Sequence, residues 1–287
     1  MVQAEIYFRP KSLEKALNYL DEHKDATLWA GGTDLVVKLE HKKVRVSQII
    51  DLKSVNELNF IEDADQIRIG ALTTIHDIEV SPVIKREFPL LAEAAHVLGS
   101  WQVRTLATVG GNLVTAAPSV ETATPILILG GTMIAQSKNG DRIIPAKHFF
   151  KGPGKTALIP GEILKEIQLP RLPLDYQSIY LKESLRRSMD IALVSVACVL
   201  KLDGDRCQEV RLGLGAVAPV PMRAIKSEES LTEQIMSAEL IEKAAKIAAD
   251  ECQPIDDIRA NASYRRELVQ VLVKRALTSL WKAGAKS

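Results

Sequence analysis

The chain has 287 residues, a formal net charge of +1, 46% hydrophobic residues and 25% charged residues. This length can form one large domain or two to three smaller ones, and the composition is that of an ordinary globular protein. The nearly balanced charge gives no indication of a nucleic-acid or membrane-surface partner.

The sequence also lacks the usual targeting and metal-binding patterns. Residues 1–17 carry charges early and contain no continuous apolar stretch, unlike a secretory signal. No apolar run approaches the roughly 20 residues that a membrane-spanning helix needs. Cys198, Cys207 and Cys252 are scattered, and no C-x-x-C or H-x-x-x-H spacing occurs. We therefore expect a cytoplasmic protein that binds no metal through this chain alone.

Strands and helices alternate in the first part of the chain. Residues 13–20 place Leu13, Ala16, Leu17 and Leu20 on one helical face, with Ser12 as N-cap. Residues 89–99 predict a helix that ends at Gly99. Strands are predicted at residues 26–32 (running into glycine), 47–52, 66–72, 132–137, 141–146 and 162–170.

The pattern changes after a proline-containing break near residues 170–176. Residues 190–205 predict a long β-branched strand, and residues 209–219 its hairpin partner. Residues 238–251 and 264–282 predict two amphipathic helices.

Two segments contain adjacent glycines, WAGGTDL at 29–35 and ATVGGNLVTAAPSVETATP at 107–125. A strand that ends in glycines and turns into a helix exposes backbone N–H groups toward an anion, and the missing Cβ atoms allow a phosphate to approach. The first segment offers Gly31 and Gly32, with Thr33 as a helix cap or hydroxyl donor. The second offers Thr108, Gly110, Gly111, Asn112 and Thr115.

Together the two segments predict loops that close around the pyrophosphate of one dinucleotide. A single glycine pair is better explained by a tight turn, and it is the presence of two such segments that favours the dinucleotide. Other phosphate motifs are excluded. GPGKT at 152–156 lacks the Walker glycine because residue 149 is Phe, and Pro219 and Pro221 block the helix that GLGAVA at 213–218 would need.

Six motifs, in this order, resemble the FAD-binding medium subunit of molybdenum hydroxylases, with the closest likeness to three-subunit xanthine dehydrogenases. The resemblance covers essentially the whole chain, and the two glycine motifs together are its most specific part. The motifs are LWAGGTDLVVKL, IGALTTIHDI, TVGGNLVTAAPSVETATPILILGG, FFKGPGKT, LKESLRRSMDIALVSVA and DDIRANASYRRELVQVLVKRAL.

This resemblance implies an α+β fold. It consists of a two-lobed FAD-binding domain of the vanillyl-alcohol-oxidase and MurB-like (PCMH) type, followed by a C-terminal α/β domain with an antiparallel sheet and helices. We expect lobe 1 at residues 1–58, lobe 2 at 59–172 and the C-terminal domain at 173–287.

The resemblance also implies a function. The chain would be the FAD-carrying electron-transfer subunit of a xanthine dehydrogenase-like enzyme. Electrons would come from iron–sulfur clusters on a small partner subunit, which receives them from molybdopterin on a large subunit. They would leave for NAD⁺ or another acceptor. The complex would be a cytoplasmic dimer of heterotrimers, with no nucleic-acid or membrane partner.

The resemblance further implies which residues contact the cofactor. These are Ala30, Gly31, Gly32, Thr33, Asp34, Leu35, Thr108, Gly110, Gly111, Asn112, Thr115, Glu121, Leu164, Lys182 and Asp190. Glu121 stands where many relatives have Asp, and Leu164 resembles an apolar contact near the adenine. Lys182 resembles a lysine near the flavin, with Asp190 close by; the alternative for Lys182 is a solvated strand lysine.

Neither glycine segment contains His or Cys, so we expect FAD to bind noncovalently, and we identify no catalytic acid–base pair and no metal ligand. Trp29 is expected to pack under the first glycine segment, and Trp101 to cover either the flavin or the surface. Arg104 would balance phosphate charge or form a surface ion pair. Two alternatives remain open: a self-contained flavoprotein oxidoreductase that acts on its own small substrate, and a non-redox module that binds a nucleotide or assembles partners.

Overall fold

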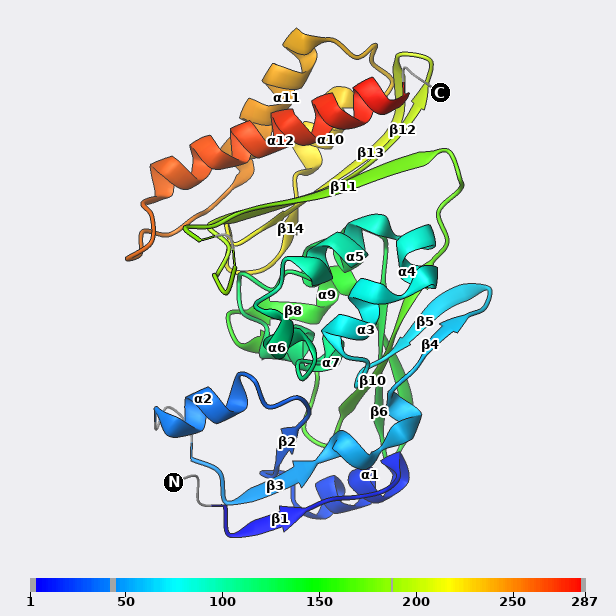
Figure 1. Cartoon of the computed structure of the whole chain (residues 1–287), viewed down its shortest axis with the longest axis vertical. Coiled ribbons are helices and arrows are strands. Elements are labelled where there is room, and N and C mark those ends of the chain that lie inside the picture. Colours follow the sequence, from blue (N-terminus) through cyan, green and yellow to red (C-terminus); the bar gives the residue numbers. More distant parts are fainter. Residues whose placement is uncertain (1–3, 42–44, 187, 285–287) are drawn as a thin grey trace.

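The computed structural model describes residues 4–41, 45–186 and 188–284. Three β-sheets follow one another along the long axis of the molecule (Figure 1). A three-stranded sheet lies at one end, a five-stranded sheet in the middle, and a four-stranded sheet covered by long helices at the other end. The predicted mixture of helices and sheets, an α+β fold, is confirmed.

The first sheet is parallel, with strand order β1-β3-β2. As predicted, the Ser12 hydroxyl accepts a hydrogen bond from the Lys15 N–H, and the following helix buries its apolar face. Because all strands run the same way, their carboxyl ends share one edge, and the first glycine segment follows β2 at that edge. The elements are β1 (Ile6–Phe8), α1 (Leu13–Glu22), β2 (Thr27–Trp29), α2 (Leu35–Glu40), β3 (Gln48–Asp51) and the 3₁₀ turns η1 (Leu52–Ser54) and η2 (Asn56–Leu58).

The middle sheet is antiparallel in order β4-β5-β10-β6-β7, with its central strand β10 far along the chain from its neighbours. Its strands are β4 (Ile61–Asp63), β5 (Gln66–Gly70), β6 (Thr132–Ser137), β7 (Gly140–Pro145) and β10 (Ile163–Pro170), and β8 (Phe150–Gly152) pairs with β9 (Lys155–Thr156). The helices are α3 (Ile75–Val80), α4 (Pro82–Glu87), α5 (Pro89–His96), α6 (Trp101–Arg104), α7 (Val109–Thr115), α8 (Ala123–Ile128) and α9 (Ala146–Phe149).

Helix α5 is shorter than predicted, since it ends at His96 rather than Gly99. Gly99 adopts a left-handed backbone conformation with φ of 55°, which turns the chain. Ser100 then caps α6 by accepting a hydrogen bond from the Val103 N–H. The glycine therefore marks the turn between two helices rather than the end of one.

The third sheet is antiparallel in order β11-β12-β13-β14 and contains the predicted hairpin. The predicted strand start at residue 190 is wrong, because β12 begins at Val194. The Asp190 carboxylate accepts hydrogen bonds from the N–H groups of Arg186 (2.8 Å) and Ile191 (3.0 Å), which holds this stretch in a turn. The strands are β11 (Tyr176–Glu183), β12 (Val194–Asp203), β13 (Arg206–Gly215) and β14 (Met222–Arg223).

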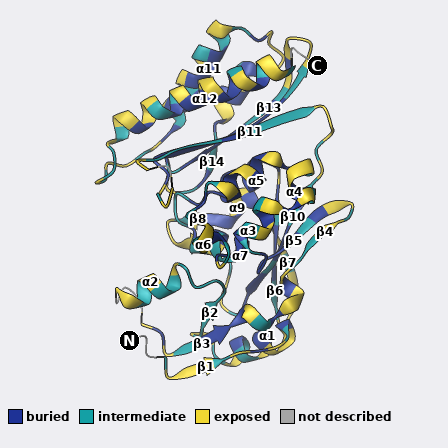
Figure 2. Ribbon diagram, in the orientation of Figure 1, coloured by how far each residue is buried: buried dark blue, intermediate teal, exposed yellow. Residues whose placement is uncertain are grey.

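Strand β12 is buried on both faces, which explains its continuous apolar sequence. Val196 and Cys198 pack into the core beneath the C-terminal helices, whereas Ala197 and Val199 join the core of the middle sheet. Figure 2 shows the C-terminal helices with buried and exposed stripes. The third sheet is thus fixed to the rest of the chain by a shared core.

The helices beyond residue 220 lie on the outer face of the third sheet (Figure 1). They are α10 (Ile225–Leu231), α11 (Ala238–Glu251) and α12 (Ala262–Gly284), and the last two match the predicted helices at 238–251 and 264–282. Within the described part of the chain, no helix combines the length and the apolar character needed to cross a bilayer.

The core predicts a stability difference between two chemically identical substitutions. Leu91 on α5 is fully buried in the middle core, whereas Leu174 is fully exposed. We expect Leu91→Ala to lower the free energy of unfolding by about 2–5 kcal/mol, since it removes buried methyl groups and leaves a cavity. Leu174→Ala should leave it nearly unchanged. Urea unfolding of both variants measures this, and equal losses would contradict the assigned core.

Candidate functional site

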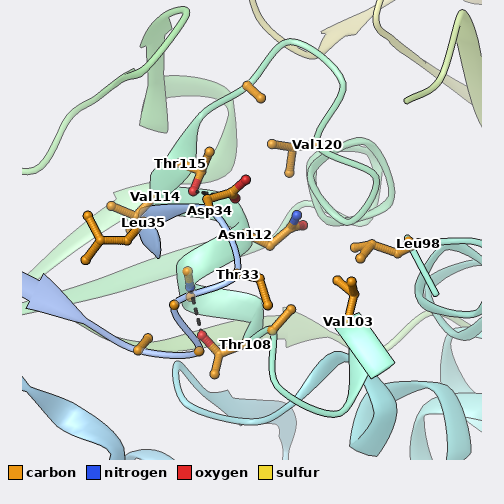
Figure 3. Close-up of a pocket in the computed structure, with 18 of the residues that line it drawn as sticks. Thr33, Asp34, Leu35, Leu98, Val103, Thr108, Asn112, Val114, Thr115 and Val120 are labelled. Carbon is orange, nitrogen blue, oxygen red and sulfur yellow. Dashed lines mark hydrogen bonds between the residues drawn. The ribbon is translucent and has the colours of Figure 1, made fainter. Parts of the chain in front are cut away.

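A cleft of about 590 Å³ lies between the first glycine segment and α7. Residues 30–35 form one wall, residues 107–121 form the opposite wall, and residues 189–191 contribute at one side. Figure 3 shows the side chains of Thr33, Asn112 and Val120 around the same space. Of the predicted site residues, the cleft is lined by Ala30, Gly31, Gly32, Thr33, Asp34, Leu35, Thr108, Gly110, Gly111, Asn112, Thr115, Glu121, Leu164 and Asp190.

The glycines of the first segment are required by the fold itself. A Cβ on Gly31 would lie 2.0 Å from the Leu106 carbonyl oxygen, so only glycine lets this segment pack against the chain before α7. Gly32 has a φ of 78°, and a Cβ there would lie 2.6 Å from Nε1 of Trp29. The predicted packing of Trp29 under this segment is therefore confirmed.

The first segment presents unused hydrogen-bond donors. Among the described residues, the backbone N–H groups of residues 31–34 have no hydrogen-bond acceptor. Asp34 precedes α2 without capping it through its side chain, and Thr33 does not cap it either, contrary to one expectation from the sequence. Consecutive N–H groups without partners form a concave surface suited to an anion.

The second segment differs from the prediction, because its backbone donors are already used. Thr108 caps α7, and its hydroxyl accepts a hydrogen bond from the Gly111 N–H at 3.1 Å. The Val109 N–H donates to the Thr73 carbonyl and the Gly110 N–H to the Ala71 carbonyl. These N–H groups are unavailable because the segment is the first turn of a helix that packs against the chain just after β5. What remains for a ligand is its side chains.

Two side-chain hydrogen bonds hold the second segment in place. The Thr115 hydroxyl donates to the Asp34 carboxylate at 3.1 Å and so connects the two walls (Figure 3). The Thr122 hydroxyl donates to Oδ1 of Asn112 at 2.6 Å. The amide nitrogen of Asn112, which has no acceptor among the described residues, is therefore oriented as a donor for a ligand.

Glu121 and Lys182 form a buried ion pair, in which Glu121 lines the cleft and Lys182 lies behind it. The distance from Nζ to Oε1 is 2.8 Å, and the two side chains are 6% (Lys182) and 11% (Glu121) exposed. Burial raises the pKa of the Glu121 carboxyl, while the ammonium of Lys182 acts in the opposite direction. Lys182 is thus not a solvated strand lysine, but it also does not line the cleft.

Asp190 lines the cleft within the turn that precedes β12. Desolvation raises the pKa of the Asp190 carboxyl. The hydrogen bonds from the N–H groups of Arg186 and Ile191 lower it by more, so the pKa lies below its usual value. Arg187, part of the motif at 181–197, lies outside the described residues.

Neither Trp101 nor Arg104 lines the cleft. Trp101 is 58% exposed on the surface. Arg104 is buried, with Nε 2.7 Å from the Glu79 carboxylate, so it forms neither a phosphate contact nor a surface pair. The three cysteines are buried and unbridged, and burial raises the pKa of Cys207 and Cys252 to about 12. Within the described residues, no group of three or more His, Cys, Asp or Glu side chains could hold a metal ion.

The sequence did not predict the apolar walls of the cleft. They come from strands, helices and turns whose apolar side chains look like any other core residues. These residues are Leu28, Leu52, Leu58, Leu72, Leu98, Val103, Val114, Val120 and Ile163, with Lys38, Met189 and Ile191 at other lining positions. Without the folded chain, no signal separates an apolar cleft from an apolar core.

A cleft with apolar walls beside free backbone donors is typical of a cofactor-binding site. Comparison with known families identifies the class of protein to which the chain belongs. Residues 2–172 match the family model described as "FAD binding domain in molybdopterin dehydrogenase". Residues 179–280 match the "CO dehydrogenase flavoprotein C-terminal domain". The fold is therefore the FAD-binding fold of the PCMH type followed by its C-terminal domain.

Individual relatives agree over nearly the whole chain. The "Glyceraldehyde dehydrogenase medium chain" of Sulfolobus acidocaldarius is 34% identical over 94% of this chain and 96% of that protein. A putative xanthine dehydrogenase FAD-binding subunit of Escherichia coli is 32% identical, over 98% of this chain and 97% of that protein. A solved structure of carbon monoxide dehydrogenase from Hydrogenophaga pseudoflava is 30% identical, has a TM-score of 0.94, and matches 98% of this chain and 99% of that chain. The chain belongs to the FAD-binding subunits of the molybdenum hydroxylase oxidoreductases.

The residues of the cleft fit FAD. The N–H groups of residues 31–34 can receive the charged pyrophosphate, and the amide of Asn112 adds a donor from the opposite wall. The apolar walls suit flat aromatic rings, and the cleft volume falls within the roughly 300–1,000 Å³ of small-molecule sites. The fit thus rests on donors and walls that are present in the chain itself.

The two glycine segments predict unequal responses to alanine. Gly31→Ala should lower the free energy of unfolding by about 1–3 kcal/mol, because its Cβ meets backbone that cannot move aside. Gly111→Ala should lower the free energy of unfolding by less than about 1 kcal/mol. Its Cβ would lie 3.0 Å from the Thr108 hydroxyl, which belongs to a side chain, and 3.8 Å from the Ala30 Cβ, and alanine favours the helix. Urea unfolding compares them, and a larger loss for Gly111→Ala would contradict this packing.

Proposed function

We propose that this chain is the electron-transfer subunit of a molybdenum hydroxylase. It receives electrons from iron–sulfur clusters on a small partner subunit and delivers them to NAD⁺. The observation that carries the proposal is the cleft, in which the unpartnered N–H groups of residues 31–34 lie opposite α7, whose first turn contains Gly110 and Gly111. Membership of the FAD-binding family over both parts of the chain supports it.

Residues 30–35 would hold the pyrophosphate, with Thr108, Asn112 and Thr115 contributing from the second wall. FAD, when bound, supplies the ability to accept electrons singly and to release them as a pair. The chain orients the cofactor and excludes water through its apolar walls. The titratable residues that line the described cleft are Asp34, Lys38, Glu121 and Asp190, with no histidine or cysteine, which supports noncovalent binding.

The partners would be a large molybdopterin-binding subunit and a small iron–sulfur subunit, in a dimer of heterotrimers. The relatives support this, because several carry the names "medium chain" or "medium subunit". Their names differ in substrate, from glyceraldehyde and carbon monoxide to nicotine. We infer that the large subunit selects the substrate, and a xanthine dehydrogenase-like enzyme in the cytoplasm is our specific proposal.

We further propose that the cleft joins two lobes at residues 1–58 and 59–172, and that the domain at 173–287 closes one side of it. The three sheets, at residues 6–51, 61–170 and 176–223, support this division. The turn at residues 189–191 is the part of the third unit that reaches the cleft.

Substitution of Gly111 tests the proposed position of FAD. A Cβ on Gly111 would lie 3.0 Å from the Thr108 hydroxyl and 3.8 Å from the Ala30 Cβ, so Gly111→Val fills the gap between the walls. We expect the FAD dissociation constant to rise roughly tenfold or more, which is about 1.4 kcal/mol of binding free energy. Quenching of flavin fluorescence on titration of the purified chain measures it.

Ser279→Val is the matched control, because Ser279 is exposed on α12 and does not line the cleft. It should bind FAD like the parent chain. Equal FAD affinity in Gly111→Val and the parent would count against the site. Failure of NADH to reduce the bound flavin would remove NAD⁺ as acceptor, while reduction by a small substrate without partners would favour a self-contained oxidoreductase.

A further inference from the structure

Lys182 makes contacts that set it apart from the other residues around the cleft. Its ammonium donates to Oε1 of Glu121 (2.8 Å), to the carbonyl of Asp190 (2.8 Å) and to the carbonyl of Val97 (3.1 Å). A lysine ammonium has three donors, and all three are used. Lys182 therefore has no donor left for a ligand.

Its three acceptors belong to three separate segments that form the cleft. Val97 precedes Leu98 and Gly99, Glu121 itself lines the cleft, and Asp190 lies in the turn at 189–191. The main chains of the first and third segments also meet directly, since the Met189 N–H donates to the Gly99 carbonyl at 3.1 Å. One buried cation thus connects two parts of the middle unit with the turn before β12.

The pair also controls charge at this wall. Glu121 and Lys182 are both buried and together carry no net charge. If either partner is removed, the other is left as an uncompensated charge in a desolvated place, which costs more free energy than an exposed pair would. The other charged residues that line the described cleft are Asp34, Lys38 and Asp190, and the Asp34 carboxylate contributes to the raised pKa of Glu121.

We propose that Lys182 is a positioning residue of the cleft, which holds these three segments together and keeps the wall at Glu121 electrically neutral. It acts on the cofactor through Glu121 and the turn at 189–191 rather than by direct contact. The proposal rests on the proposed function, because its main readouts require FAD in this cleft.

Three variants of the full chain test this role: Lys182→Met, Glu121→Gln and the double variant. Methionine keeps the length and apolar body of lysine but none of its donors. We expect Lys182→Met to raise the FAD dissociation constant roughly tenfold, because the segments lose their shared anchor. Fluorescence titration measures this. Thermal unfolding without FAD checks the fold, and the double variant, which leaves no buried charge unpaired, should unfold close to the parent.

The midpoint potential of the bound flavin separates positioning and charge control from a purely structural role. Reduction adds negative charge, so an unpaired Glu121 carboxylate in Lys182→Met should lower the potential. An unpaired ammonium in Glu121→Gln should raise it, and the double variant should return toward the parent value. A residue needed only for folding would not give shifts of opposite sign.

Weaker FAD binding together with opposite potential shifts supports the proposal. Unchanged FAD binding and potential in Lys182→Met, or shifts of the same sign in both single variants, overturns the proposal alone. A parent chain that binds no FAD overturns the proposed function, and this proposal with it.

Discussion

The whole site depends on one close approach, between Gly31 and the main chain at Leu106. A Cβ at residue 31 would lie 2.0 Å from the Leu106 carbonyl oxygen, so the two segments can meet only through glycine. This contact fixes how far the first sheet stands from α7 and thereby sets the width of the cleft. The Thr115–Asp34 hydrogen bond then joins the same two walls farther along. The shape of the cleft is therefore set by backbone packing. The groups that can contact a ligand lie on the two segments that this packing brings together.

The adjacent glycines look alike in the sequence but serve different purposes in the structure. Gly31 and Gly110 are required by packing, since a Cβ on Gly110 would lie 2.6 Å from the Ala71 carbonyl oxygen. Gly32 is required by its positive φ, and a Cβ on Gly111 would meet only side-chain atoms. The hypothesis that a cofactor explains every glycine was thus too broad. A pair of adjacent glycines in the sequence indicates that side chains are not tolerated there. It does not indicate whether a neighbouring segment, a positive φ or a ligand is the reason.

Most of the elements could be predicted because their signals are local. The periodicity of α1, α11 and α12 and the β-branched run of β12 each depend on a few consecutive residues. The start of β12 could not be predicted, because it is set by the Asp190 carboxylate that binds two main-chain N–H groups. Ile191, Ala192 and Leu193 are as apolar as the strand that follows, so only the folded turn distinguishes them from it. The glycine segments were predicted from their sequence and the other candidate cofactor residues from the resemblance, and their joint position around one cleft required the fold.

The Glu121–Lys182 pair joins residues 61 positions apart, and its burial follows from the alternation of β11. Tyr180 is buried in the middle core, and Lys182, two residues later, points to the same side of the strand. Leu181, between them, packs instead under the C-terminal helices. Lys182 is thus the position at which the inner face of β11 leaves the apolar core and reaches the polar wall of the cleft. A cation is accommodated there because Glu121 and two carbonyls meet at that point, so the third sheet, which contributes no glycine segment, still determines the shape of the cleft.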